Sequence, residues 1–197
     1  LQNPVSTKAI VSGASDFYMS TDSLYICCQN WEYGKSSTQI LKFSCVDGEI
    51  TASNMAELPG YLNDTFSLDE YDGYLRVLTT EDGNGESNNL FVLDKDMNTI
   101  STIRDIASGE TIRSARFVGD MGYFVTFRQT DPLFCVDLSD PENPEILSEL
   151  KISGFSSYLH MYGENRLLGI GYEADEDTGS QTGVKLSMFD ISDPENV

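Results

Sequence analysis

Four times in this 197-residue chain, a segment of alternating apolar and polar side chains ends in a glycine just before a new strand-like run. The four glycines, Gly13, Gly60, Gly109 and Gly154, stand 47, 49 and 45 residues apart. A period of this length is typical of a four-stranded propeller blade and is too long for most helical solenoids. The spacing therefore predicts a repeat protein built from antiparallel β-meanders.

The same order of elements recurs within each period. A first strand follows the glycine, and a tight turn leads to a second, strongly apolar strand. A loop then leads to a third strand, which reads QILKFSC, NLFVLDK, PLFCVDLSD and KLSMFDISD in the successive repeats. Aromatic and β-branched residues in short alternating runs, with Asp-Gly pairs between them, indicate strands joined by hairpins. We therefore expect an all-β chain that forms a β-propeller of four-stranded antiparallel blades.

The chain is expected to be one propeller region, residues 1–197, with repeats at 14–60, 61–109, 110–154 and 155–197. The last repeat lacks a fourth strand, and residues 1–13 match the segment that would supply it. Two arrangements stay open. Residues 1–13 either close a small ring, by pairing of residues 5–11 with 186–191, or belong to a preceding blade. We favour the second arrangement, an arc of a larger propeller, although an arc leaves strand edges and apolar faces exposed.

The formal net charge of −20 and the isoelectric point near 4.1 bear on the partners of the chain. Such a charge repels phosphate backbones and anionic lipids, so nucleic-acid and membrane-surface roles are unfavourable. The sequence contains no run of about eighteen apolar residues, which a membrane-spanning helix would need. The first ten residues do not have the pattern of a signal peptide, so any export signal is expected outside this chain.

Residues 110–193 resemble a family of secreted bacterial proteins with a C-terminal β-propeller that is distantly related to WD repeats. The resemblance rests on LFCVDLSDPENPE, where an apolar run precedes an aspartate and a Ser-x-Pro turn, and on VKLSMFDISDPEN. It implies a bacterial protein that is extracellular or on the cell surface. It also implies a propeller of more than four blades, and it supplies no agreed activity.

Topology predicts where a binding site would lie. In a meander, the loops between second and third strands share one face with the glycine crossings between blades, and these loops vary most in length. We expect ligand-binding side chains near the axis of this variable face, with two aromatic residues of the loop 29–38 at its rim: Arg113, Arg116, Arg128, Tyr158, His160, Trp31 and Tyr33. Guanidinium and imidazole groups would bind an anionic group of a ligand. The alternative is a structural network in which the arginines pair with strand ends, Asp131 or Asp137.

Acidic loops are a second candidate site, for calcium. Oxygen-bearing side chains alternate at Asp82, Asn84 and Glu86, and a similar run contains Asp175, Asp177 and Gly179. This spacing is found in calcium loops, but the later bidentate glutamate is missing. Solvated turns are the other interpretation, and no other cofactor is expected.

The four cysteines, Cys27, Cys28, Cys45 and Cys135, do not have the spacing of a metal site. We expect buried thiols. One disulfide stays open as an alternative, because the count is even and the protein is expected to be exported.

These observations predict an extracellular binding module for a protein or carbohydrate ligand, without catalysis, and with self-association if the propeller is incomplete. The alternative is a propeller enzyme such as a glycoside hydrolase, which needs two carboxylates about 5–10 Å apart. Asp94, Asp137 and Asp190 recur at equivalent positions. We therefore interpret them as architectural residues that hold the backbone N–H groups of turns.

Overall fold

The computed structural model describes residues 13–197 with the exception of residues 84, 129–130 and 176–179. Within these ranges the chain forms four antiparallel sheets, which we call blades 1 to 4. Blade 1 consists of β1 (Asp16–Met19), β2 (Ser23–Glu32), β3 (Lys35–Val46) and β4 (Glu49–Pro59). A short 3-10 helix, η1 (Thr65–Ser67), precedes blade 2, which consists of β5 (Leu68–Tyr71), β6 (Tyr74–Glu81), β7 (Ser87–Leu93) and β8 (Thr99–Ile106). Blade 3 consists of β9 (Thr111–Val118), β10 (Met121–Phe127), β11 (Asp131–Asp137) and β12 (Glu145–Ile152). Blade 4 consists of β13 (Phe155–Met161), β14 (Arg166–Ala174) and β15 (Gln181–Asp190).

Strand order equals chain order in every blade, as expected for a meander. The prediction of an all-β chain with propeller blades is confirmed, and each blade lies within one of the four expected repeats. The predicted pairing of residues 5–11 with blade 4 lies outside the described residues. Within the part of the chain that the structure describes, no helix is long and apolar enough to span a membrane.

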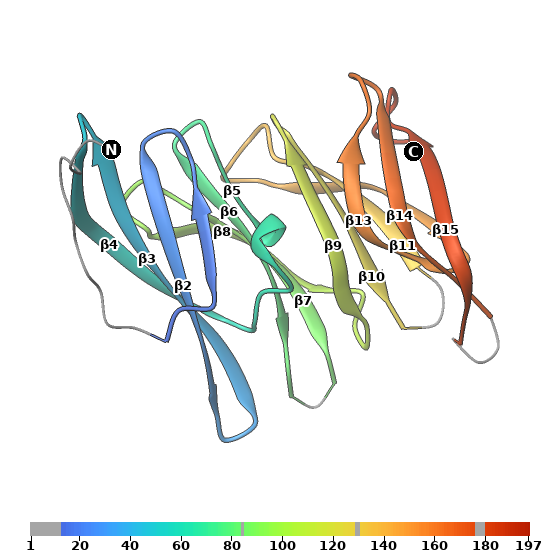
Figure 1. Ribbon diagram of the computed structural model, residues 1–197, viewed down its shortest axis with the longest axis horizontal. Helices are drawn as coiled ribbons and strands as arrows, with labels where there is room; N and C mark the ends of the chain where they lie inside the picture. The colour runs from blue at the N-terminus through green and yellow to red at the C-terminus, as the bar shows by residue number, and fades with distance from the viewer. Residues whose placement is uncertain (1–12, 84, 129–130, 176–179) are drawn as a thin grey trace, which may run out of the picture.

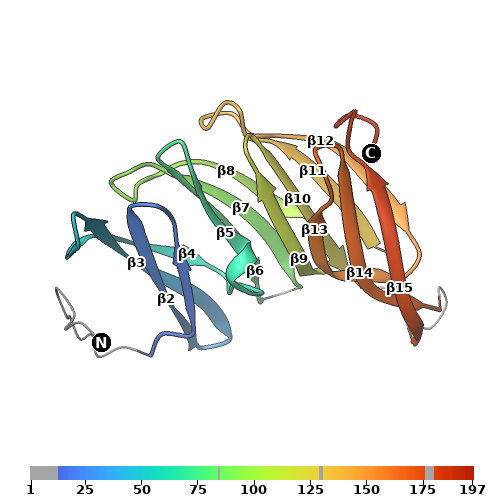
Figure 2. The same ribbon diagram turned by 45° about the horizontal axis from the view of Figure 1, so that its top comes forward.

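The four blades stand side by side in chain order and form an arc (Figures 1 and 2). Blades 1 and 4 lie at opposite ends of the row in both views. The first strands β9 and β13 contact one another, and η1, which precedes β5, contacts both β9 and β1. The first strands therefore line the inner side of the arc, which we call the inner-strand face.

Three hydrophobic cores hold the arc together, one at each junction between blades. The third strands of the middle blades are buried on both faces. In β11, for example, Phe134 and Val136 belong to the core with blade 2, and Leu133 and Cys135 belong to the core with blade 4. Alternation along a strand sends neighbouring side chains to opposite faces. The continuous apolar runs of the third strands therefore reflect a blade that is covered on both sides.

The repeating glycine marks a place where the chain crosses tightly between blades. Gly60 and Gly154 have φ angles of +89° and +71°, which favour glycine. A Cβ atom would lie 2.7 Å from the carbonyl oxygen of Thr80 at Gly60, and 2.2 Å from that of Tyr172 at Gly154. Each crossing thus presses against the second strand of the next blade, which leaves no room for a side chain.

The architectural role predicted for the recurring aspartates is confirmed. The Asp94 carboxylate accepts hydrogen bonds from the backbone N–H groups of Asp96 (2.9 Å) and Asn98 (2.8 Å). Asp137 accepts from the N–H group of Ser139 (2.8 Å), and Asp190 from that of Ser192 (3.1 Å). Hydrogen bonds to Asn98 hold the pKa of Asp94 below its usual value, and hydrogen bonds to Ser192 do the same for Asp190. The same turn is therefore fixed in three successive blades.

The loop expected over residues 29–38 is instead a long hairpin. Residue pairing between β2 and β3 continues to Glu32 and Lys35, so only Tyr33 and Gly34 remain in the turn. Both have positive φ angles, 51° and 76°, as a tight two-residue hairpin turn requires. The prediction was wrong because polar strand residues at an exposed hairpin look like a loop in the sequence.

All four cysteines are free thiols. Cys27, Cys28 and Cys135 are buried as expected, and Cys45 is half-buried. Burial raises the pKa of Cys27 to about 12 and that of Cys135 to about 11. These thiols are therefore protonated at neutral pH and act as small apolar residues in the cores.

Candidate functional site

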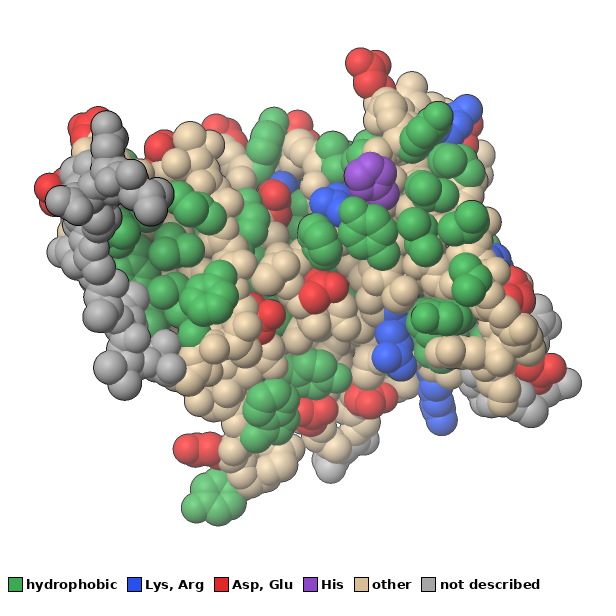
Figure 3. All heavy atoms as spheres, in the orientation of Figure 1, with side chains coloured by type: hydrophobic (Ala, Val, Ile, Leu, Met, Phe, Trp, Pro, Cys, Tyr) green, Lys and Arg blue, Asp and Glu red, His purple; other side chains and the backbone are tan. Residues whose placement is uncertain are grey.

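Four side chains meet on the inner-strand face, and we call them the inner-strand cluster: Phe66, Arg116, Tyr158 and His160. The hydroxyl of Tyr158 lies 3.1 Å from Nδ1 of His160, and their rings stack with centroids 5.9 Å apart. The Arg116 guanidinium lies 4.5 Å from the ring centroid of Phe66 and 5.6 Å from that of Tyr158. The structure thus brings together three of the predicted residues and adds Phe66. The single histidine is visible on this face beside hydrophobic side chains (Figure 3).

Backbone contacts hold Arg116 in place. Its Nε and Nη2 atoms donate to the carbonyl oxygen of Leu159 at 3.0 and 2.8 Å, which ties blade 3 to blade 4. Among the described residues, no carboxylate forms an ion pair with Arg116. A guanidinium has five N–H groups, so this contact leaves further donors. The cluster therefore presents a fixed positive charge between aromatic rings.

The inner-strand cluster does not lie at the variable face, where it was expected. Arg116 is the sixth residue of β9, and His160 is the sixth residue of β13. Six residues of a strand span about 17–20 Å, so both side chains lie toward the end of the strand that is remote from the glycine crossing. The prediction was wrong because it treated these residues as the beginnings of their strands.

Arg113 and Arg128 lie at the glycine-crossing end and make other contacts. The Arg113 guanidinium lies 5.5 Å from the ring centroid of Phe127 and 5.8 Å from that of Phe155. Nη1 of Arg128 lies 3.4 Å from where a Cβ atom of Gly109 would be. Neither arginine forms an ion pair with Asp137 or any other carboxylate that the structure describes, and the side chain of Asp131 lies outside that description. The predicted five-residue cluster is therefore divided into two groups.

Trp31 and Tyr33 lie on the hairpin between β2 and β3. Trp31 stacks on Tyr61 with ring centroids 6.1 Å apart, although 60% of its side chain is exposed. Tyr33 is fully exposed at the turn. The two residues form a rim at the glycine-crossing end, away from the inner-strand cluster.

A groove of about 240 Å³ extends the inner-strand cluster toward blade 1. Its walls include Phe66 and Arg116 of the cluster, together with Phe17, Met19 and Phe117. Phe17 and Met19 are more than half exposed. Exposed apolar side chains around a fixed cation are typical of a surface that binds a partner.

One carboxyl group near this face was missed by the sequence analysis. Burial is the main cause that raises the pKa of Asp64, and the charge of Asp16 raises it further. The Asp64 side chain also accepts a hydrogen bond from the N–H group of Phe66 at 2.9 Å, which caps η1. Aspartate at the start of a helical turn is common, so no sequence signal distinguished this residue from an ordinary cap.

The structure describes the two acidic loops predicted to bind calcium only in part. Asn84, Asp177 and Gly179 lie outside the described residues. Within the described ranges, no group of three or more histidine, cysteine, aspartate or glutamate side chains is arranged to hold a metal ion. Calcium binding by these loops stays a prediction.

Comparison with known proteins places the fold in context. The profile of the family described as "Beta propeller domain" matches residues 2–197. An uncharacterized protein of Archaeoglobus fulgidus is 51% identical over 156 residues, which are 79% of this chain and 23% of that protein. The uncharacterized protein MJ1554 of Methanocaldococcus jannaschii is 40% identical over 172 residues, which are 85% of this chain and 26% of that protein. The chain therefore spans about a quarter of the length of these archaeal relatives, which do not support the expected bacterial source.

Two solved structures share the architecture. The computationally designed Ika4 protein superposes with a TM-score of 0.58 at 11% identity, over 97% of this chain and 99% of that chain. A neuraminidase-like protein from A/bat/Guatemala/164/2009 gives a TM-score of 0.55 at 13% identity, over 91% of this chain and 55% of that chain. At these identities the likeness concerns the fold alone.

Proposed function

Because this chain belongs to the Beta propeller domain family, we propose that it is an extracellular or cell-surface binding module. The inner-strand face holds a protein or carbohydrate ligand that carries an anionic group. The activity of the longer proteins to which its relatives belong is not part of this proposal, since the chain corresponds to about a quarter of them.

The observation that carries the proposal is the setting of Arg116. Its guanidinium is fixed by the carbonyl oxygen of Leu159, lies between Phe66 and Tyr158, and forms no ion pair with a described residue. Aromatic rings exclude water around the guanidinium, and opposite charges attract one another more strongly where the effective dielectric constant is lower. Local positive charge therefore attracts the ligand despite the net charge of −20.

Binding should be measured against a panel of glycans and surface proteins on immobilised chain. The test variant carries Phe66→Ala and His160→Ala, two exposed side chains whose removal leaves the Arg116 contact with Leu159 intact. A second variant, Arg116→Ala, removes the cation itself. We expect at least tenfold weaker binding in each, for Arg116→Ala through the loss of one charge-assisted contact and for the double variant through the loss of two side chains of the cluster.

Arg128→Ala is the matched control, because Arg128 is an exposed arginine beside the Gly109 crossing, away from the inner-strand cluster. It should bind as the wild type does. The proposal is wrong if Arg128→Ala abolishes binding while the cluster variants keep it. The urea midpoint of each variant shows whether its fold is intact.

The enzyme alternative has one observation in its favour, the raised pKa of Asp64 beside the charge of Asp16. A glycoside hydrolase needs a protonated carboxylic acid and a second carboxylate. Under the binding proposal, Asp64→Asn leaves ligand affinity unchanged and the bound glycan uncut. Turnover of a glycan by the wild type that disappears in Asp64→Asn would support the alternative instead.

As a second partner we propose another copy of the chain. It binds the apolar side of blade 4 that points away from blade 3. Positions on this side are covered by the next blade in blades 2 and 3. A second copy of the chain supplies blades of the same kind, so it is the occupant that fits. Sedimentation velocity should show concentration-dependent dimers that Leu186→Asp weakens, and a strictly monomeric wild type would contradict the proposal.

A further inference from the structure

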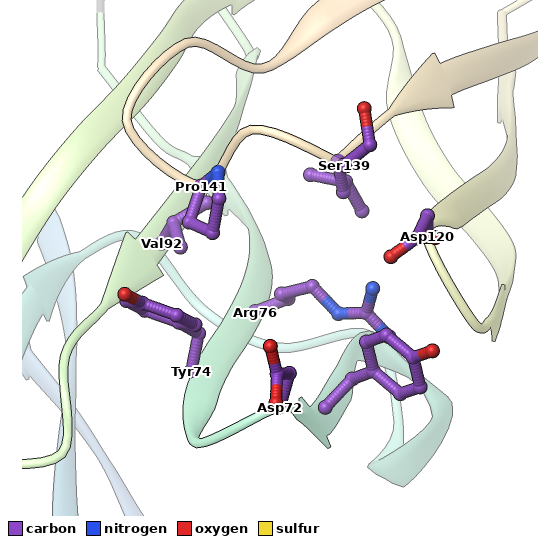
Figure 4. Close-up of a pocket in the computed structure, with 9 residues that line it drawn as sticks. Asp72, Tyr74, Arg76, Val92, Asp120, Ser139 and Pro141 are labelled. Carbon is purple, nitrogen blue, oxygen red and sulfur yellow. The ribbon is translucent and has the colours of Figure 1, made fainter.

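A separate pocket of about 180 Å³ lies between blades 2 and 3, at the end of the arc with the short turns (Figure 4). The β5–β6 turn, the β9–β10 turn and the segment after β11 all contribute to it. The side chains that matter for its chemistry are Tyr71, Asp72, Tyr74, Arg76, Asp120 and Pro141. No described residue lines both this pocket and the groove beside the inner-strand cluster.

The base of the pocket is apolar and rigid. Val92 and Leu138 are almost fully buried and belong to the core between blades 2 and 3. Tyr74 packs against the same core, and Pro141 forms part of the wall. Apolar walls around a space of this size suit the C–H groups of a single small ring.

Arg76 supplies a fixed donor at one side of the pocket. Only 3% of its surface is exposed, and Nη1 donates to the carbonyl oxygen of Gly119 at 2.5 Å. Nη2 forms an ion pair with Asp69, so the charge of the guanidinium is compensated. Nε is buried and donates to no acceptor among the described residues. Nη1 and Nη2 each have a second N–H group beyond these two contacts, so the guanidinium can donate to an acceptor atom of a ligand in the pocket.

Two carboxylates supply acceptors across from Arg76. Figure 4 shows the side chains of Asp72 and Asp120 directed into the same space as the guanidinium. Both residues are exposed, and neither forms an ion pair within the described part of the chain. Carboxylates accept hydrogen bonds only, so a ligand in this pocket pairs with them through donor groups.

The geometry points to a neutral, polyhydroxylated ligand in this pocket, a single sugar unit. Its hydroxyl groups donate to Asp72 and Asp120 and accept from Arg76, while its C–H face lies on the apolar base. A hydroxyl group can donate and accept at once, which neither a simple anion nor a simple cation can do. An anion would be repelled by two uncompensated carboxylates, and an ammonium cation has no atom that accepts a hydrogen bond from Arg76.

The test is a titration of the whole chain with methyl glycosides of neutral hexoses, by calorimetry and ligand-observed NMR. The variant carries Asp72→Asn and Asp120→Ala. Asparagine tolerates the positive φ of 50° at residue 72, and Asp120 is exposed, so the fold should persist. We expect saturable binding of at least one glycoside to the wild type and at least tenfold weaker binding to the variant.

Asp22→Ala, which removes an exposed acid far along the chain from this pocket, is the matched control and should bind as the wild type does. The Phe66→Ala and His160→Ala variant should also keep hexoside binding, which separates this pocket from the inner-strand face. The inference is overturned if no hexoside binds saturably or if the double variant binds equally well. Binding of cadaverine that depends on the same two aspartates, without hexoside binding, would also overturn it and assign the pocket to a cation.

Discussion

Blades 3 and 4 carry equivalent residues on the side that faces away from the N-terminus, but only blade 3 buries them. Leu133 and Leu186 both stand four residues before the recurring aspartate, and they are 1% and 69% exposed. Cys135 and Met188 stand two residues before it, and they are 0% and 52% exposed. Position in the arc, and not residue type, therefore decides which side chains form a core.

The second strands repeat this contrast. Val125 pairs with Leu133 in blade 3, and Ile170 pairs with Leu186 in blade 4. Val125 is buried in the core with blade 4, whereas Ile170 is exposed. Hydrophobic side chains gather over β13–β15 in the space-filling view (Figure 3). Blade 4 therefore displays an apolar surface whose equivalent in blade 3 is buried against the next blade.

The largest effect is expected at the crossing that joins the two blades. Gly154→Ala places a Cβ atom 2.2 Å from the carbonyl oxygen of Tyr172, where the backbone cannot yield without moving β14. We expect a loss of more than about 3 kcal/mol in the free energy of unfolding, or no folded protein at all. Urea denaturation followed by circular dichroism measures this loss.

Gly163→Ala is the matched control for that variant. Gly163 has a φ of +70°, almost equal to the +71° of Gly154, but nothing lies within 4 Å of its Cβ position. Only backbone strain of about 1 kcal/mol is expected there. Equal losses at the two glycines would show that close contact between the blades is not what requires Gly154.

The next largest effect is a difference in stability between variants of two equivalent leucines. Leu133→Ala leaves a cavity in the core between blades 3 and 4 and should cost about 2–4 kcal/mol. Leu186→Ala removes an exposed side chain and should cost less than about 1 kcal/mol at low protein concentration. Urea midpoints of the two variants measured side by side check this, and a similar cost for both would mean that blade 4 is also covered.

The turn aspartate of blade 4 gives a smaller, pH-dependent effect. The folded pKa of Asp190 is lowered by hydrogen bonds to Ser192, with a further contribution from Arg166. Its stabilising contribution is therefore present above the unfolded pKa of about 4 and is lost as pH falls through the lower folded value. Asp190→Asn should lower the melting temperature at pH 7, and the difference from wild type should shrink toward pH 2–3.

Asp22→Asn, at another exposed aspartate, controls for the loss of one negative charge. It should change the melting temperature little at either pH. A pH-independent deficit in Asp190→Asn would show that the ionised carboxylate is not what holds the turn.

The sequence predicted the blades well because their requirements are local. A tight crossing demands glycine, as at Gly60 and Gly154, and a turn held by its own carboxylate demands aspartate, as at Asp94. These constraints repeat in every blade, so the pattern stands out against background.

The candidate site was harder to predict because its geometry depends on irregular pairing. Ile112 and Ser114 pair with consecutive residues of β10, so Arg113 lies in a bulge and has no partner there. A bulge of this kind redirects side chains, so simple alternation along β9 does not give the direction of Arg113. Phe66 joined the cluster through η1, a short turn between blades for which no periodic signal exists.

Thiol labelling tests directly whether blade 4 exposes the side that blade 3 buries. Met188→Cys creates a thiol at the position equivalent to Cys135, and both can be followed by mass spectrometry after brief alkylation at pH 8. Burial raises the pKa of Cys135 to about 11, whereas an exposed thiol has a pKa of about 8.5. We expect that, in dilute protein, Cys135 reacts more than about a hundredfold more slowly than the new thiol. Equal protection of both thiols would contradict it.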